Sequence, residues 1–292
     1  AVDAPLLGNG FTGIALSGNP EAQVFYLSRN DFWRLRSALD ESFPLVLGKI
    51  ELSIPGLQGA SYRVEQNLYD AVTTAHFDLD GRSVFYKAWL SATDDIFVVE
   101  IGMTGSGTLE GTAKLSLPGK KEIQVKLPFE RAFPYMEEVK ILPNGISYLS
   151  RACEDSVDIK TKAAMAMNVS GSRDGSFILS EGKIIRLTCS FSSNFKSKDC
   201  TAEVIKRVTD ISPASIGKIE ENHKKWWKAY WEKSFVSIPD RVIEKQYYRS
   251  LYGIACSSRD PQFPPSIFGN WITAERPNWN GDYHLNYNHE AP

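Results

Sequence analysis

Hydrophobic and polar residues alternate along most of the first 200 residues, with the period of two that is typical of β-strands. The alternation is clear at residues 49–54, 75–79, 84–88, 122–127, 177–179 and 185–191. Asp80-Gly81 predicts a two-residue hairpin turn, and Glu181-Gly182 predicts a second turn. The unbroken apolar run at 96–99 (IFVV) predicts a strand that is buried on both faces. So many short strands predict a mainly β fold, a large two-sheet antiparallel supersandwich.

The periodicity changes near Thr201, where apolar residues begin to recur at spacings of three and four. Ser212-Pro213 is typical of a helix start, with a capping hydroxyl followed by proline at the first helical position. The apolar face of this helix comprises Ile216, Ile219, His223, Trp226, Trp227, Tyr230 and Trp231. Three tryptophans at helical spacing predict a packing seam rather than a ligand site.

A second helix is predicted to begin at Pro239-Asp240. Its predicted apolar face comprises Ile243, Tyr247, Leu251 and Ile254. The chain is therefore predicted to have a β-supersandwich domain at 1–200, a helical linker at 201–238 and the start of a helical domain at 239–292.

Composition excludes several classes of protein. Of the 292 residues 42% are hydrophobic and 23% are charged, and the net charge of −2 gives no basic surface for nucleic acid. No apolar run is long enough to span a membrane. We expect no metal and no cofactor, because no motif for either is present. We expect a secreted or periplasmic protein. The first residues do not resemble a signal peptide, so we expect that the signal peptide is absent or removed.

The four cysteines are too scattered for a disulfide scaffold or a zinc site. Cys189 and Cys200 could form a disulfide, and buried free thiols are the alternative.

Residues 264–292 form a loop-like stretch in which aromatic rings alternate with short amide and carboxylate side chains. Sugars are recognised by such mixtures, because their C–H faces stack on rings while their hydroxyls need paired donors and acceptors. The stretch therefore predicts a sugar pocket, and the alternative is a loop that covers the core. The candidate substrate-binding residues are Trp271, Trp279, Asp282, Tyr283, His284 and Glu290.

Several segments, in order along the chain, resemble glycoside hydrolase family 95, the α-L-fucosidases and α-L-galactosidases. Residues 4–13 (APLLGNGFTG) and 27–33 (LSRNDFW) are similar to the PLGNGxxG and LNExxxW segments with which that family begins. Residues 43–55 and 62–90 are similar to its N-terminal β domain. Residues 268–271, 278–279 and 282–288 resemble its QGLWN…PPW…YxxNxN segment.

The resemblance implies a β-supersandwich, a helical linker and an (α/α)6 toroid, of which this chain would contain only the first helix. It also implies an inverting mechanism whose acid and base carboxylates lie beyond residue 292. By resemblance, Asn286 and Asn288 are the catalytic candidates, a pair of amides that orient the attacking water. The residues around this pair, including Glu290, depart from the family pattern, so the sugar is left open.

The glycines at 8, 10 and 13 are interpreted as marking tight turns rather than a phosphate site, because no strand leads through them into a helix. Asn9, Asn30, Asp31 and Trp33 are further candidates for the rim of a pocket.

The favoured function is the N-terminal part of an inverting exo-acting glycoside hydrolase. It would remove a terminal α-linked sugar, of α-L-fucoside or α-L-galactoside type, from an oligosaccharide or glycan. A related disaccharide phosphorylase and a non-catalytic carbohydrate-binding β-sandwich are the alternatives, and a purely structural module fits the polar-aromatic stretch less well. We expect the 292-residue chain alone to be inactive, since the general acid would be missing.

Overall fold

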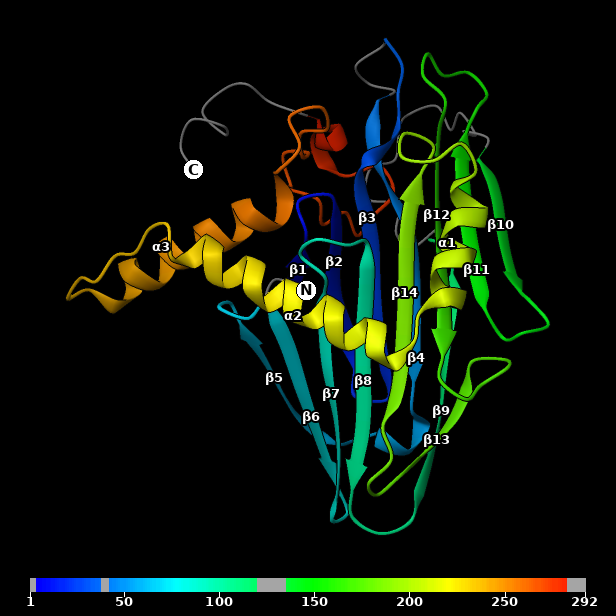
Figure 1. The fold of residues 1–292 in the computed structure, drawn as a ribbon, viewed down its shortest axis with the longest axis vertical. Helices are drawn as coiled ribbons and strands as arrows, with labels where there is room; N and C mark the ends of the chain where they lie inside the picture. The colour runs from blue at the N-terminus through cyan, green and yellow to red at the C-terminus, as the bar shows by residue number, and fades with distance from the viewer. Residues whose placement is uncertain (1–3, 38–41, 120–134, 283–292) are drawn as a thin grey trace.

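The computed structural model describes residues 4–37, 42–119 and 135–282. Two antiparallel β-sheets pack face to face and are followed by helices, which confirms the predicted fold class (Figure 1). The six-stranded sheet has the order β1-β2-β3-β4-β9-β13, and the eight-stranded sheet has the order β10-β11-β12-β14-β8-β7-β6-β5. The strands are β1 (Leu6–Gly8), β2 (Thr12–Asn19), β3 (Ala22–Arg34), β4 (Phe43–Ser53), β5 (Ser61–Asn67), β6 (Val72–Leu79), β7 (Arg82–Leu90), β8 (Ile96–Thr104), β9 (Thr108–Ser116), β10 (Met136–Ile141), β11 (Ser147–Cys153), β12 (Thr161–Val169), β13 (Ser176–Ser180) and β14 (Ile185–Ser193).

The alternating patterns become strands whose apolar side chains fill the space between the sheets. In β4, Ile50 and Leu52 are buried while Glu51 is exposed. Leu79 pairs with Arg82 across the predicted two-residue turn, whose central residues both have positive φ (50° at Asp80 and 75° at Gly81), as this turn type requires. The strand predicted at 122–127 lies outside the described residues.

Residues 96–99 are buried on both faces, as predicted, because they form the first half of β8. One face lies in the inter-sheet core. The other packs under α2 (Pro213–Trp231), where Val98 and Trp89 contact Ile216. The turn at Glu181-Gly182 joins the two sheets, since β13 pairs with β9 whereas β14 pairs with β12 and β8.

Each of the three α-helices in the described residues begins at a side-chain cap. Asp199 caps α1 (Cys200–Asp210), Ser212 caps α2 through a capping box with Ser215, and Asp240 caps α3 (Arg241–Ser257). Figure 1 shows α1 and α2 against the outer face of the eight-stranded sheet, with α3 above β5 and β6. Within the described ranges, every helix is too short or too polar to cross a membrane.

The predicted apolar face of α3 is wrong. Ile243 and Ile254 are 59% and 45% exposed, and the buried face carries Tyr252, Ala255 and Cys256 instead. The periodicity identified the helix, but contacts with Trp227 and the N-terminal strand decide which face is buried. All four cysteines are buried free thiols, so Cys189 and Cys200 do not form a disulfide.

His223 links α2 to the sheet as a buried, neutral imidazole. Its Nδ1 accepts a hydrogen bond from the Ala92 N–H (3.1 Å), and its Nε2 lies 2.7 Å from the Asp70 carbonyl oxygen. Because Nδ1 accepts from a backbone N–H, the ring proton is on Nε2, where it is donated to Asp70. Burial lowers the pKa of His223 below its ordinary value.

We expect His223 to make the free energy of unfolding depend on pH. A lowered pKa in the folded state means that the unfolded chain binds the proton more readily. The stabilising contribution is thus complete above the unfolded pKa of about 6.5 and declines as the pH falls from there through the lower folded-state pKa. His223→Gln can keep both hydrogen bonds without titrating. In urea unfolding between about pH 7.5 and pH 5, the wild type should therefore lose more stability than this variant. Identical losses would contradict the assignment.

Candidate functional site

The polar-aromatic stretch is anchored at one end of the sandwich by Asn270. Its side-chain amide donates to the Cys256 carbonyl (3.0 Å) at the end of α3, and its own carbonyl accepts from the Ser28 hydroxyl (2.5 Å) on β3. The same hydroxyl accepts from the Ile272 N–H (3.0 Å). Most of the following residues up to Pro277 are buried, so this part of the stretch covers the core.

The glycines of the GNGFTG segment allow the end of α3 and the stretch to approach the sandwich closely. A Cβ atom at Gly8 would lie 2.4 Å from the Cys256 carbonyl oxygen, and one at Gly13 would lie 1.9 Å from that of Asn270. Of these three glycines only Gly10 has a positive φ (85°), and a Cβ atom there would lie 2.2 Å from Cγ of the Arg259 side chain. The glycines are therefore structural, as predicted, but two of the three serve close packing rather than a turn.

Arg259 fixes the chain where it leaves α3. Its guanidinium lies 3.6 Å from the centre of the Trp226 ring and donates to the carbonyls of Ala255 (2.6 Å) and Ala92 (2.7 Å). Burial lowers its pKa to about 10, so it remains charged at neutral pH. The carbonyl end of α3 and the Trp226 ring face both favour that charge.

Trp271 is half-buried and packs with Tyr252 and the other aromatic residues between α2 and α3. Its indole N–H donates to the Leu7 carbonyl (2.8 Å), so its polar edge is used inside the protein. The ring also lines a hollow of about 490 Å³. The other lining residues are Ala4, Pro5, Leu6, Val64, Gln66, Leu68, Arg249, Tyr252 and Gly253.

Unlike Trp271, which is half-buried, Trp279 is 69% exposed. It lies in the short helix η4 (Asn278–Gly281) with a left-handed backbone (φ 56°, ψ 29°), and Arg276 and Asn280 both have φ of 53°. Left-handed conformations are costly for bulky residues and tend to cluster at functional sites. This turn packs on Pro44 at the start of β4.

Asp282 ends the described part of the stretch and is half-buried. Its carbonyl accepts from the Ile267 N–H (3.1 Å), which closes a loop that contains Trp279 three residues before Asp282. The structure thus brings Trp279 and Asp282 together on this loop, whereas Trp271 faces the helices. The other predicted site residues, Tyr283, His284, Asn286, Asn288 and Glu290, lie outside the described residues.

Sequence reasoning missed Arg151 on β11 and Glu275 in the stretch. Both are buried, and Arg151 Nη1 lies 2.6 Å from Glu275 Oε1. Burial alone would lower the pKa of Arg151, but the carboxylates of Glu275 and Glu137 raise it. The two residues are 124 positions apart, and no local motif contains either of them.

The candidates near the N-terminus belong to a buried polar network rather than to a pocket rim. Arg29 pairs with Asp31 (2.9 Å) and Asp95 (3.0 Å), and Asn9 donates to Asp95 (2.9 Å). Asn30 donates to the Gly10 and Ser257 carbonyls, and the half-buried Trp33 donates to the Asn30 carbonyl. Burial opposes the charge on Arg29, yet the two carboxylates raise its pKa. These contacts hold the sandwich and the end of α3 together.

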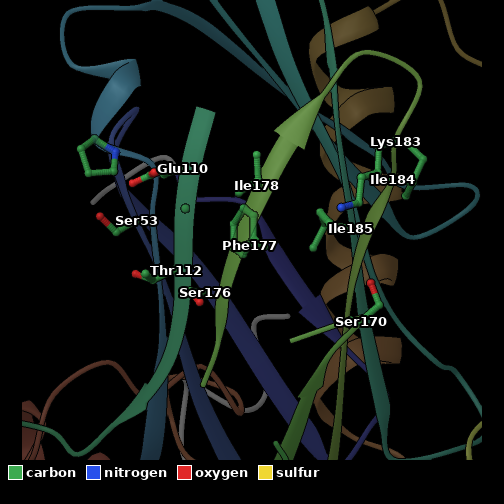
Figure 2. Close-up of a pocket in the computed structure, with 13 residues that line it drawn as sticks. Ser53, Glu110, Thr112, Ser170, Ser176, Phe177, Ile178, Lys183, Ile184 and Ile185 are labelled. Atoms are coloured by element: carbon green, nitrogen blue, oxygen red, sulfur yellow. The ribbon is translucent and has the colours of Figure 1, made fainter. Parts of the chain in front are cut away.

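A larger hollow of about 780 Å³ lies around β13 (Figure 2). In Figure 1, β13 is at the opposite end of the sandwich from the polar-aromatic stretch. Figure 2 shows Phe177 and Ile178 of β13 between two groups of side chains. One group comes from the end of β4 and from β9, and the other from residues 183–185, where β14 begins, and from Ser170 after β12. Ser53 lines this hollow, whereas Pro44 on the same strand contacts the Trp279 turn. Nine residues of strand separate the two by about 30 Å, so the hollow is remote from the loop. Among the described residues, no cluster of His, Cys, Asp and Glu could hold a metal ion.

No protein-family model matches the sequence, and no curated protein matches it. A solved structure designated a kojibiose phosphorylase from the human microbiome is similar with a TM-score of 0.58 and 12% identity, over 90% of this chain and 41% of that one. A bacterial glucoamylase complexed with acarbose has a TM-score of 0.45 and 9% identity, over 86% and 40%. A family GH92 α-mannosidase from Bacteroides thetaiotaomicron has a TM-score of 0.37 and 10% identity, over 94% of this chain and 41% of that one.

The chain therefore spans about two fifths of the length of these structures. At 12% identity, the similarity to the phosphorylase structure is a similarity of fold. The TM-scores of the glucoamylase and the α-mannosidase are too low to support a conclusion about this chain. The fold, a β-sandwich followed by helices, thus also occurs within a chain designated a sugar phosphorylase.

Proposed function

We propose that this chain is the N-terminal part of an inverting exo-acting glycoside hydrolase that removes a terminal α-linked sugar from a glycan. The sugar is proposed to be of α-L-fucoside or α-L-galactoside type, as the sequence resemblance to family 95 implies. Residues 1–200 would form the sandwich domain, 201–238 the linker and 239–292 the beginning of the catalytic domain.

The observation that carries the proposal is the exposed Trp279 on an anchored loop. An indole that is 69% exposed and held in a left-handed backbone offers a flat apolar face to a ligand. Asp282 lies three residues further on and would offer a carboxylate to sugar hydroxyls. This pairing of a ring with a carboxylate supports a sugar ligand.

Trp271 takes a secondary part in this proposal. Its indole N–H is bonded to Leu7, so it would contact a sugar only through the ring that lines the smaller hollow. Its removal should therefore affect stability first and sugar binding second.

A disaccharide phosphorylase is the second candidate, since a solved structure that shares the fold carries that designation. The two candidates differ in the nucleophile, water in a hydrolase and inorganic phosphate in a phosphorylase. A carbohydrate-binding module without catalysis is the third outcome to be distinguished.

The test uses the full-length parent protein with a panel of aryl glycosides that includes the α-L-fucoside and the α-L-galactoside. We expect release of the aryl group without phosphate and, by proton NMR, initial formation of the β-anomer. Purified 292-residue chain should release none, because the acid that supplies about 10²–10⁴-fold of the rate would be missing. Turnover only in phosphate would favour the phosphorylase. A folded parent that binds glycans but cleaves none would leave only the binding module.

A further inference from the structure

Arg151 connects three parts of the molecule at the end of the sandwich that holds the Trp279 loop. It lies on β11 of the eight-stranded sheet, and its Nε donates to Glu137 on the neighbouring strand β10 (2.8 Å). Its Nη1 donates to the Val46 carbonyl on β4 of the six-stranded sheet and to Glu275 in the polar-aromatic stretch (2.6 Å). One side chain thus bridges both sheets and the stretch.

The surroundings of Arg151 hold its guanidinium in one orientation. The side chain is 2% exposed, and its Cζ lies 4.9 Å from the centre of the Tyr135 ring and 6.0 Å from that of Phe32. A planar guanidinium has several donors in fixed directions, so its bonds to Glu137 through Nε and to Val46 through Nη1 orient the plane in which it meets Glu275. Arg151 therefore ties the Glu275 carboxylate to the sandwich.

Glu275 lies close to Trp279 in the sequence, so its contact with Arg151 bears on the position of the Trp279 ring. Only three residues separate it from Trp279, and Arg276 between them already has a left-handed backbone. The Arg276 guanidinium also lies 5.3 Å from the Phe43 ring centre, so the chain direction after Glu275 is fixed on both sides of the residue. We expect a shift of Glu275 to move the exposed indole, which follows four positions later in the chain.

We propose that Arg151 and Glu275 are a positioning pair, which sets the place of Trp279 and Asp282 relative to the sugar without contacting it. This inference rests on the proposed function. Displacement of a substrate-positioning group by about 1 Å can cost about 10²-fold in rate, so a buried pair whose carboxylate precedes Trp279 by four positions can control catalysis.

Glu137 provides a matched control, because it is the second carboxylate on the same arginine but lies outside the stretch. Glu275→Gln and Glu137→Gln each remove one charge and keep the side-chain shape. In the full-length parent, we expect Glu275→Gln to lower kcat/KM for the aryl glycoside by about 10²-fold and Glu137→Gln to lower it less than about 3-fold. Glu275→Asp, which keeps the charge on a shorter arm, should give an intermediate loss and decides the matter if the Gln variant does not fold.

A second measurement does not depend on catalysis. In the 292-residue chain, hydrogen–deuterium exchange of residues 270–282 should accelerate in Glu275→Gln and stay at the wild-type rate in Glu137→Gln. Equal effects of the two variants, or an unchanged Glu275→Gln, would overturn the positioning role. If the wild-type parent cleaves no glycoside, the proposed function fails, while the exchange rates still decide whether the pair positions the loop.

Discussion

Replacing Asn286 or Asn288 by alanine in the full-length parent is expected to lower kcat by about 10²–10³-fold, with little change in KM. We propose, from the resemblance to family 95, that the two asparagines orient the attacking water, and they follow closely after Asp282 in the sequence. An amide that places this water acts mainly in the transition state, so its loss lowers kcat and kcat/KM together. Steady-state kinetics with an aryl glycoside checks this result.

Trp279→Ala is the matched control for that experiment. Trp279 is exposed and has no place in the core, so this variant should fold normally and raise KM while kcat changes little, if the ring only stacks on the sugar. Near-parental kcat in folded Asn286 and Asn288 variants would show that the assignment is wrong and that the loop only binds.

Trp227→Ala is expected to lower the free energy of unfolding by about 3–5 kcal/mol, the largest stability effect that we expect from one substitution in this chain. Trp227 is fully buried, and its ring lies 5.3 Å from the Tyr252 ring of α3 and 5.9 Å from the Trp231 ring. Truncation would leave a cavity where α2, α3 and the sheet meet, because the surrounding rings cannot collapse into it.

Urea unfolding followed by circular dichroism measures this effect without relying on tryptophan fluorescence. The exposed Lys225 on the same helix is the control, and Lys225→Ala should change stability by less than about 0.5 kcal/mol. A loss below about 1 kcal/mol for Trp227→Ala would mean that the aromatic seam is not the main link between the helices and the sandwich.

The sequence by itself determined the elements that depend on neighbouring residues. Alternation in 49–54 and 75–79, with Asp80-Gly81 between strands, specified strands and a hairpin, because side-chain period and turn geometry are local properties. Ser212 and Asp240 specified the starts of α2 and α3 for the same reason, since a cap bonds within three residues. The mainly β fold followed from the number of such strands.

The tertiary structure decided what depends on contacts between distant residues. The spacing of apolar residues in α3 fits more than one face, and only Trp227 and Leu6 select the face with Tyr252. From the sequence, the glycine segment is interpreted as a series of turns. The structure shows instead that Gly8 and Gly13 leave room for the backbones of Cys256 and Asn270. Nothing in the sequence marks Arg151 and Glu275 as partners. Their ion pair forms only when folding buries the two side chains together, although they are 124 positions apart in the sequence.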